Sequence, residues 1–113
     1  MKNEIKSPAN LPLSILERGP GGEVALEACI ETLAEAKLAA AHNLNRVELC
    51  AALDLGGLTP TAALISACAE VVEVHAMIRP RGGDFVYTAD EENLMLAEVR
   101  NAKKAGAAGV VFG

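Results

Sequence analysis

The sequence predicts an α/β protein of parallel strand–helix units, amounting to about half of a closed (β/α) barrel. Three observations predict this class. Four short stretches with strand-like alternation are separated by single stretches of helical periodicity, the order βαβαβαβ, and such crossovers make neighbouring strands parallel. The strand candidates are apolar on one face and polar on the other. Finally, a complete barrel takes roughly 250 residues, or about 200 at the compact end, whereas the chain has 113.

The first 23 residues are dense in residues that interrupt regular structure. These are Pro8, Pro12, Gly19, Pro20, Gly21 and Gly22. We therefore expect an N-terminal extension or cap over residues 1–23 with little regular structure, followed by one domain over residues 24–113.

The domain is expected to begin with a strand over residues 24–30 and a helix capped by Thr32. The Thr32 hydroxyl and Glu35, three residues later, have the spacing of a capping box. Helical periodicity predicts that this helix buries Leu33, Ala36 and Ala40. A second strand follows over residues 46–51.

A Gly56-Gly57 loop precedes the second helix, for which Thr59 has the residue type of an N-cap and Pro60 that of a first helical residue. Periodicity predicts that this helix buries Leu64, Cys68 and Val71. The third strand is expected over residues 72–79.

The loop over residues 80–87 leads to a third helix, for which Thr88 and Glu91 have the spacing of a second capping box. This helix is expected to end at Gly106. Its buried residues are predicted to be Met95, Val99 and Ala102. The fourth strand is expected over residues 109–112.

Side-chain alternation assigns each of the first three strands an apolar face and a polar face. The apolar faces are Val24, Leu26, Ala28 and Ile30; Val47, Leu49 and Ala51; and Val72, Val74, Ala76 and Ile78. The polar faces are Ala25, Glu27 and Cys29; Arg46, Glu48 and Cys50; and Glu73, His75, Met77 and Arg79. An open sheet with helices on both faces would bury this polar set at considerable cost. A TIM-barrel-like arrangement, with helices outside and functional side chains within, accounts for it.

Three strand–helix units and a fourth strand cannot close a barrel alone. Two open edges and an uncovered inner face invite pairing. We expect either a piece of a longer protein or a half-barrel that associates with itself.

The net charge of −5 argues against nucleic acid or an anionic membrane as a partner. The N-terminal segment lacks the apolar run of a secretory signal, and no stretch is apolar enough to cross a bilayer. We therefore expect a cytoplasmic protein in which Cys29, Cys50 and Cys68 are thiols.

Sulfur gathers at the ends of the predicted strands, in Cys29, Cys50 and Met77. Thiolate and thioether sulfur are soft ligands that select Cu(I). We expect Cys29 and Cys50 at matching positions on neighbouring strands, with Met77 near them on the third. The alternative is that these cysteines pack as small apolar residues, as we expect for Cys68.

Charged side chains share the same face. Glu27 and Glu48, expected one pair of residues deeper than the cysteines, could divide acid and base roles with Arg79 nearby. The competing interpretation is an internal ion network of the carboxylates with Arg79 and Arg46. His75 could serve as a base or a ligand, although a single such histidine is more often only hydrogen-bonded.

The loop after the third strand combines guanidinium groups with exposed backbone N–H groups. Arg79, Arg81, Gly82 and Gly83 would suit a carboxylate or phosphate. Equally, the loop could be a rigid turn in which Asp84 pairs with an arginine and the glycines permit a tight path.

Five blocks of this sequence closely resemble the CutC family of copper homeostasis proteins. They are Glu27-Ala-Cys29-Ile, Arg46-Val-Glu-Leu-Cys50, Gly56-Gly-Leu-Thr-Pro60, Met77-Ile-Arg-Pro-Arg-Gly-Gly-Asp-Phe85 and Gly109-Val-Val-Phe-Gly113. The resemblance covers residues 24–113 and implies a (β/α)8 barrel of which the last four strands are absent here. It also implies a cytoplasmic, often oligomeric protein and matches the family's proposed Cu(I) cysteines to Cys29 and Cys50.

The sequence departs from the family pattern at three places. Glu31 stands where an aspartate is usual, and His75 stands where an apolar residue is common. Residues 42–45, His-Asn-Leu-Asn, replace a Gly-Ala-Asp turn.

Three functions are consistent with these observations. The first is a cytosolic Cu(I)-binding protein of copper homeostasis. The second is an enzyme that acts on a small anionic metabolite through Glu27 or Glu48 with Arg79 and Arg81. The third is a chain without activity of its own that serves as an assembly unit.

Overall fold

The computed structural model describes residues 3–6, 12–18 and 24–112, with side chains from residue 26 onward. Four parallel strands alternate with helices, which confirms the predicted fold class. The elements in chain order are β1 (Asn3–Lys6), β2 (Pro12–Arg18), β3 (Val24–Ile30), α1 (Leu33–Ala41), β4 (Arg46–Leu49), the 3-10 turn η1 (Leu53–Leu55), α2 (Ala62–Ala69), β5 (Val74–Ile78), α3 (Ala89–Ala105) and β6 (Gly109–Phe112).

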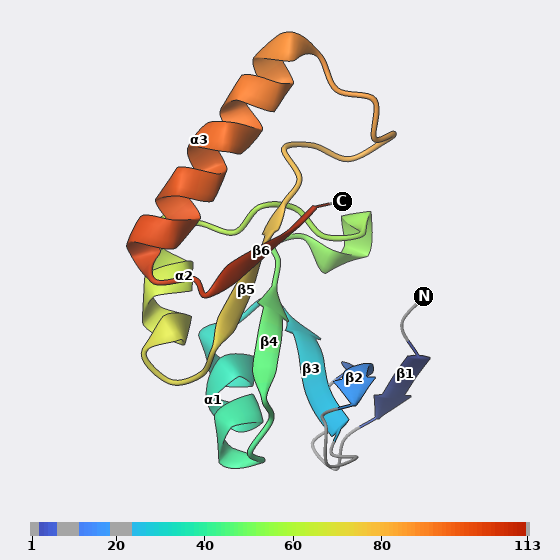
Figure 1. Ribbon diagram of the computed structural model, residues 1–113, viewed down its shortest axis with the longest axis vertical. Helices are drawn as coiled ribbons and strands as arrows, with labels where there is room; N and C mark the ends of the chain where they lie inside the picture. Colours follow the sequence, from blue (N-terminus) through green and yellow to red (C-terminus); the bar gives the residue numbers. More distant parts are fainter. Residues whose placement is uncertain (1–2, 7–11, 19–23, 113) are drawn as a thin grey trace.

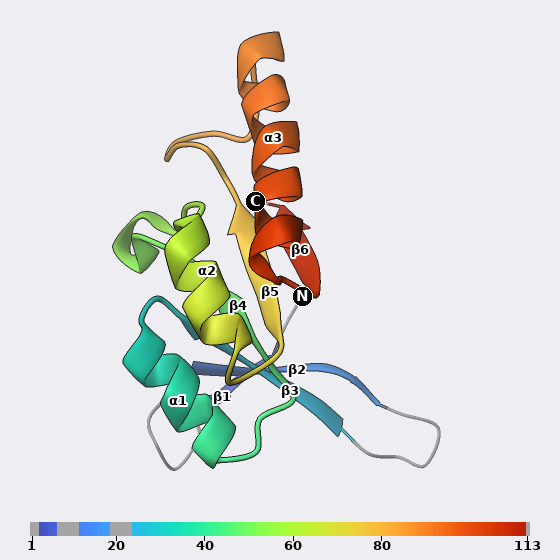
Figure 2. The same cartoon turned by 90° about the vertical axis from the view of Figure 1, so that its left-hand side faces the viewer.

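The described strands form one sheet in the order of the sequence, β1-β2-β3-β4-β5-β6 (Figure 1). The pairs from β3 to β6 are parallel, while β1-β2 and β2-β3 are antiparallel. In this sheet α1 contacts β3 and β4, α2 contacts β5, and α3 contacts β5 and β6. Figure 2 shows α1 and α2 together on one side of the parallel strands, with α3 continuing beyond α2.

The apolar core lies between the parallel strands and the helices. Its strand residues are Ala28, Ile30, Val47, Leu49, Val74, Ala76 and Ile78, and its helix residues are Ala36, Ala39, Ile65, Cys68 and Ala102. The strand members are the predicted apolar face, since they alternate along each strand. The polar residues therefore occupy the face turned away from the core.

The N-terminal segment is more regular than its proline and glycine content predicts. The strand β2 pairs along β3, with Ser14 opposite Glu27 and Leu13 opposite Ala28. Residues 13–18 contain neither proline nor glycine, and the edge of β3 offers backbone groups that a neighbouring strand can satisfy. The expectation of little regular structure before residue 24 is therefore wrong, and β3 is not an open edge.

Two strands are shorter than predicted. The strand β4 ends at Leu49 rather than residue 51, because Ala51 instead forms an isolated antiparallel bridge with Leu58. The strand β5 spans Val74–Ile78 rather than residues 72–79. The predicted bounds of β3 and β6 agree with the structure.

The second helix begins later than predicted. Thr61, not Thr59, is its N-cap, and the Leu64 N–H donates to the Thr61 hydroxyl over 3.2 Å. With this shift Ile65 and Cys68 are buried, whereas Val71 lies beyond the helix and is 39% exposed. The prediction that Val71 is buried is wrong for this reason.

The other two helices begin where the sequence predicts. The Thr88–Glu91 capping box is complete. Thr32 caps α1, because its hydroxyl accepts a hydrogen bond from the Glu35 N–H. The capping box differs from the usual form, since the Glu35 carboxylate accepts from the Thr32 hydroxyl and the Glu31 N–H and not from the Thr32 N–H. Ala39 is buried in α1, where periodicity favoured Ala40.

Candidate functional site at the polar face of the sheet

The strand register arranges the polar residues in rungs across the sheet. We call the face opposite the helices the inner face. One rung runs from Cys29 through Glu48 and His75 to Gly109, and the rung before it joins Glu27 to Arg46. Residues in one rung of parallel strands lie side by side on the same face. Glu27, Cys29 and Glu48 thus share the inner face, as the sequence predicts.

The register separates the two cysteines by one rung. Cys29 lies beside Glu48, and Leu49 pairs with Ala76, so that Cys50 follows at the level of Met77. The matching positions predicted for Cys29 and Cys50 are therefore wrong, as is the placement of Glu48 below both cysteines. Alternation fixes which face a residue occupies, but hydrogen bonds between strands fix its level.

Cys50 and Cys68 occupy buried positions on opposite sides of the sheet. Cys50 is 1% exposed, and its Sγ lies beside Gly57, where an added Cβ would approach it to 3.2 Å. Cys68 belongs to the core between α2 and the strands, as predicted, and burial raises the pKa of its thiol. Together with the partly exposed Cys29, these cysteines are thiols.

Arg79 ties together the loops at the carboxyl ends of β4 and β5. Its Nη1 donates to the carbonyls of Leu55 (2.7 Å) and Gly57 (3.2 Å), and its Nη2 donates to that of Gly83 (3.1 Å). The guanidinium also lies 5.1 Å from the centre of the Phe85 ring. Among the described residues, its buried Nε has no hydrogen-bond partner.

Thr59 holds the backbone of Arg79, a role that sequence reasoning missed. The Thr59 N–H and hydroxyl both donate to the Arg79 carbonyl, and the Arg79 N–H donates to the hydroxyl over 2.9 Å. The only sequence signal is its place in the Gly56–Pro60 block, where its residue type predicts a helix N-cap instead.

Glu27 takes part in an internal ion pair. Its carboxylate is 3.2 Å from Arg46 Nε and is almost completely buried. This contact favours the ion-network interpretation for Glu27, although Arg79 instead bonds to backbone carbonyls. Glu48 is also buried, at 6% exposure.

His75 packs against the last strand. An added Cβ at Gly109, its neighbour in the rung, would lie 3.1 Å from the imidazole. The His75 Nε2 is 3.5 Å from a carboxylate oxygen of Glu73. These contacts agree with a partnered histidine in a close-packed position.

Arg81 is engaged within its own loop. It forms ion pairs with Asp84 and Glu91 and donates to the carbonyls of Gly82, Asp84 and Val86. This supports the rigid-loop interpretation of Arg81, Gly82 and Gly83 over the anion-binding one. Hydrogen bonding from Arg81, assisted by the Thr88 N–H, also holds the pKa of Glu91 below its usual range.

Within residues 26–112, no three side chains of His, Cys, Asp or Glu come close enough together to hold a metal ion. The same described part of the chain has no helix with the length and apolar character needed to cross a membrane.

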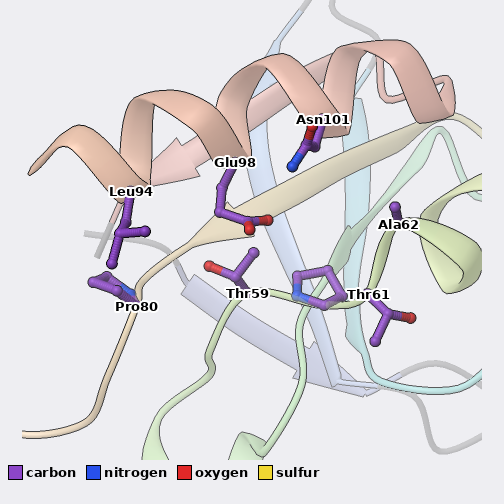
Figure 3. A pocket seen from close by; sticks show the side chains of 8 residues that line it. Thr59, Thr61, Ala62, Pro80, Leu94, Glu98 and Asn101 are labelled. Carbon is purple, nitrogen blue, oxygen red and sulfur yellow. The ribbon is translucent and has the colours of Figure 1, made fainter. Parts of the chain in front are cut away.

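A pocket of about 410 Å³ lies in the helical layer, away from the inner face (Figure 3). Its lining comes from the start of α2, from α3 and from the loops that precede them: Thr59, Pro60, Thr61, Ala62, Pro80, Leu94, Glu98 and Asn101. None of the predicted site residues lines it.

The fold and the inner face together define a parallel α/β protein with sulfur and charged side chains turned away from a single layer of helices. The chain belongs to the CutC family, whose sequence model matches residues 24–113.

Known relatives resemble this chain over part of their length. A CutC family protein of Photobacterium profundum is 45% identical over 92 residues, which cover 80% of this chain and 38% of the relative. A Caenorhabditis elegans protein named as a copper homeostasis protein CutC homolog is 44% identical over 94 residues, again 38% of its length. The chain thus spans well under half the length of these relatives.

A solved structure shares the fold. The crystal structure titled as the putative copper homeostasis protein CutC from Streptococcus agalactiae superimposes with a TM-score of 0.71 at 34% identity. The match covers 77% of this chain and 44% of the other. The strand–helix units described above therefore correspond to less than half of that protein.

Proposed function

We propose that this chain contributes a Cu(I)-binding site to a copper homeostasis protein that acts in the cytoplasm. The single observation that carries the proposal is that strand alternation sets Cys29 in β3, Cys50 directly after β4 and Met77 in β5 on the inner face. The names of the relatives from C. elegans and S. agalactiae support copper as the metal.

Sulfur chemistry favours Cu(I) over harder ions. Thiolate and thioether ligands select Cu(I), which needs only a few of them. Cys50 and Met77 are both buried and stand at one level, while the more accessible Cys29 stands one rung away. A site built on the Cys50–Met77 level, with Cys29 reaching toward it, would give a soft, poorly hydrated environment.

The proposal is tested by an anaerobic titration in which the protein competes with a chromophoric Cu(I) chelator. We expect the wild-type chain to bind one equivalent and both Cys29→Ser and Cys50→Ser to weaken binding by at least tenfold. Cys68→Ser is the matched control, because Cys68 lies in the core on the other side of the sheet. Unchanged affinity in the Cys29→Ser and Cys50→Ser variants would overturn the proposal.

A second candidate function follows from Arg79. The Arg79 Nε is a buried donor without a hydrogen-bond partner among the described residues, so an acceptor group on a ligand would satisfy it. The buried carboxylates Glu27 and Glu48 share the inner face. We propose as an alternative that the face binds a small anionic metabolite as part of an enzyme. A thermal-shift screen of carboxylates and phosphate esters should then give hits that Arg79→Lys abolishes. A screen without hits, repeated on a full-length relative, would contradict this alternative.

A further inference from the structure

The segment that follows β4 lies against the Cys50 sulfur. We call its residues 52–57, drawn in light green in Figure 1, the η1 loop. The bridge between Ala51 and Leu58 closes the base of this loop with backbone hydrogen bonds of 2.8 and 2.7 Å. At its end, Gly57 is so near that an added Cβ would lie 3.2 Å from Cys50 Sγ. Cys50 is on the face opposite the helices, so the η1 loop and not the helical layer lies over its thiol.

The backbone of the η1 loop is held in an unfavourable conformation. Ala52 has φ +47°, in the left-handed region where a residue with a Cβ is strained. Gly56 and Gly57 follow with φ of +91° and +96°, and glycine loses more conformational freedom than other residues when it is ordered. Such a loop stays closed only where contacts from the surrounding structure outweigh these costs.

Two side chains from outside the η1 loop provide such contacts. Arg79 Nη1 donates to the carbonyls of Leu55 and Gly57, over 2.7 and 3.2 Å. A carboxylate oxygen of Glu31 accepts a hydrogen bond from the Leu53 N–H over 3.0 Å. Arg79 is 7% exposed, and charge-assisted hydrogen bonds are stronger where water is excluded. The Arg79 contacts are therefore the main restraint on the loop.

Arg79 is itself fixed by residues outside the η1 loop. The Thr59 hydroxyl binds its backbone, Nη2 donates to the Gly83 carbonyl over 3.1 Å, and the guanidinium lies 5.1 Å from the centre of the Phe85 ring. The loop fits closely around this fixed group, since an added Cβ at Gly56 would lie 3.0 Å from Nη1. Arg79 thus attaches the loop to the end of β5.

We propose that the η1 loop is a cover over the Cys50 thiol and that Arg79 is the positioning residue that keeps it closed. Local opening of the loop exposes Cys50 to solutes while the sheet stays folded. This property belongs to the chain without metal. Its consequence for copper rests on the function proposed above: Cu(I) reaches Cys50 when the loop opens, so Arg79 controls how fast the metal enters and leaves.

Alkylation of the metal-free full chain by iodoacetamide, followed at each cysteine by peptide mass spectrometry, tests the proposal. Arg79→Met removes the donors to the loop carbonyls and should raise the alkylation rate of Cys50 about tenfold or more. Arg79→Lys keeps the charge but lacks the planar fork that reaches both carbonyls. Its Cys50 rate should lie between those of Arg79→Met and the wild type.

Cys68 distinguishes opening of the loop from a general loss of stability. It lies in the core on the other side of the sheet, so its alkylation reports unfolding of the whole domain. The Cys68 rate should rise steeply with urea, because global unfolding exposes a large surface. The Cys50 rate should hardly change at low urea, because local opening exposes little. In Arg79→Met the increase should be confined to Cys50.

Arg81→Met is the matched control, because it makes the same substitution two residues further along. The hydrogen bonds of Arg81 within the described residues go to its own loop and to Glu91 of α3. This control should leave the Cys50 rate within about twofold of the wild type.

Glu31 gives a second arm at an exposed position, where substitution leaves the core unchanged. Glu31→Ala removes the acceptor of the Leu53 N–H and should raise the Cys50 rate severalfold. Glu31→Gln keeps an acceptor oxygen and should stay near the wild type.

The proposal is overturned if neither Arg79→Met nor Glu31→Ala raises the Cys50 rate. It is equally overturned if the Cys68 rate rises as much, or if Arg81→Met has the same effect. Because alkylation is measured without metal, these results are separate from the Cu(I) titration. Loss of the copper proposal would leave the cover in place, and normal Cu(I) binding with unchanged alkylation would reject the cover alone.

Discussion

Gly57 determines how closely the η1 loop can approach the Cys50 sulfur. Its backbone has φ +96°, a conformation that other residues rarely adopt, and an added Cβ would lie 3.2 Å from Sγ. Both the backbone and the contact therefore favour glycine at this position. The buried surroundings of Cys50 depend on this residue as much as on the strand that carries the cysteine.

We expect Gly57→Ala to lower the free energy of unfolding by roughly 1–3 kcal/mol, because the substitution combines an unfavourable φ with a close contact. Urea denaturation followed by circular dichroism measures the change. Gly82→Ala is the control, since its Cβ would meet no atom within 4 Å. Equal effects of the two substitutions would contradict this account of Gly57.

Arg79 shows how far a residue's role can depend on contacts that its sequence position does not reveal. The sequence places it on the polar face and suggests a carboxylate partner or an anionic ligand. In the structure its guanidinium donates to three backbone carbonyls from two loops. No periodicity or motif encodes these acceptors, because every residue carries a carbonyl and only the fold selects which ones converge.

At the scale of the element, helix starts follow local chemistry. Thr88 and Glu91 satisfy N–H groups at the start of α3 within four residues of chain, so spacing alone predicts the cap. Thr59 and Thr61 are both possible caps two residues apart, and only the structure distinguishes them. The Thr59 hydroxyl is bound to the backbone of Arg79, which leaves the cap to Thr61.

Thr61→Ala should therefore destabilise the protein by about 1 kcal/mol, the usual cost of losing a hydroxyl N-cap. Thr61→Ser keeps the acceptor and should recover most of this loss. Thermal and urea unfolding of both variants measure the effect. If Thr61→Ala had no effect on stability, Thr61 would not be the cap that the geometry indicates.

Glu91 should make the stability of the protein sensitive to acid. The hydrogen bond from Arg81 lowers the pKa of Glu91 in the folded state, below the value of about 4.3 expected in the unfolded chain. The contribution of Glu91 to the free energy of unfolding is then complete above the pKa that Glu91 has in the unfolded chain. It is lost as the pH falls through the lower pKa that Glu91 has in the folded protein.

Glu91→Gln should therefore lower the free energy of unfolding at neutral pH. As the pH falls below about 4.3, the difference in free energy of unfolding between the variant and the wild type should become smaller. Urea midpoints measured across this range test the expectation. Glu98→Gln, in the same helix, is the control. If the difference in free energy of unfolding between Glu91→Gln and the wild type did not change with pH, the proposed stabilisation by ionised Glu91 would be contradicted.

At the scale of the molecule, the β1-β2 hairpin extends the sheet beyond the family match. The family match begins at residue 24. The strand β2 pairs with the side of β3 that faces away from β4. In a closed barrel this edge would pair with another parallel strand. Here an antiparallel strand from the same chain satisfies it.

Proline within β2 should expose that edge. Because β2 has a neighbour on each side, Ser14→Pro removes an N–H from one ladder or the other. We expect reduced stability and greater association at high concentration, measured by urea unfolding and light scattering. Ser14→Ala keeps the N–H and serves as the control, and a Ser14→Pro variant that behaved like it would contradict the pairing.

The sequence by itself determined the alternation of faces, two of the three helix caps and the family of residues 24–113, because each depends on residues close together in the chain. Only the tertiary structure decided that Cys29 stands beside Glu48, that Arg79 holds two loops, and that β2 covers β3. Strand register and edge pairing depend on hydrogen bonds between distant segments, and these are satisfied only when the sheet has formed.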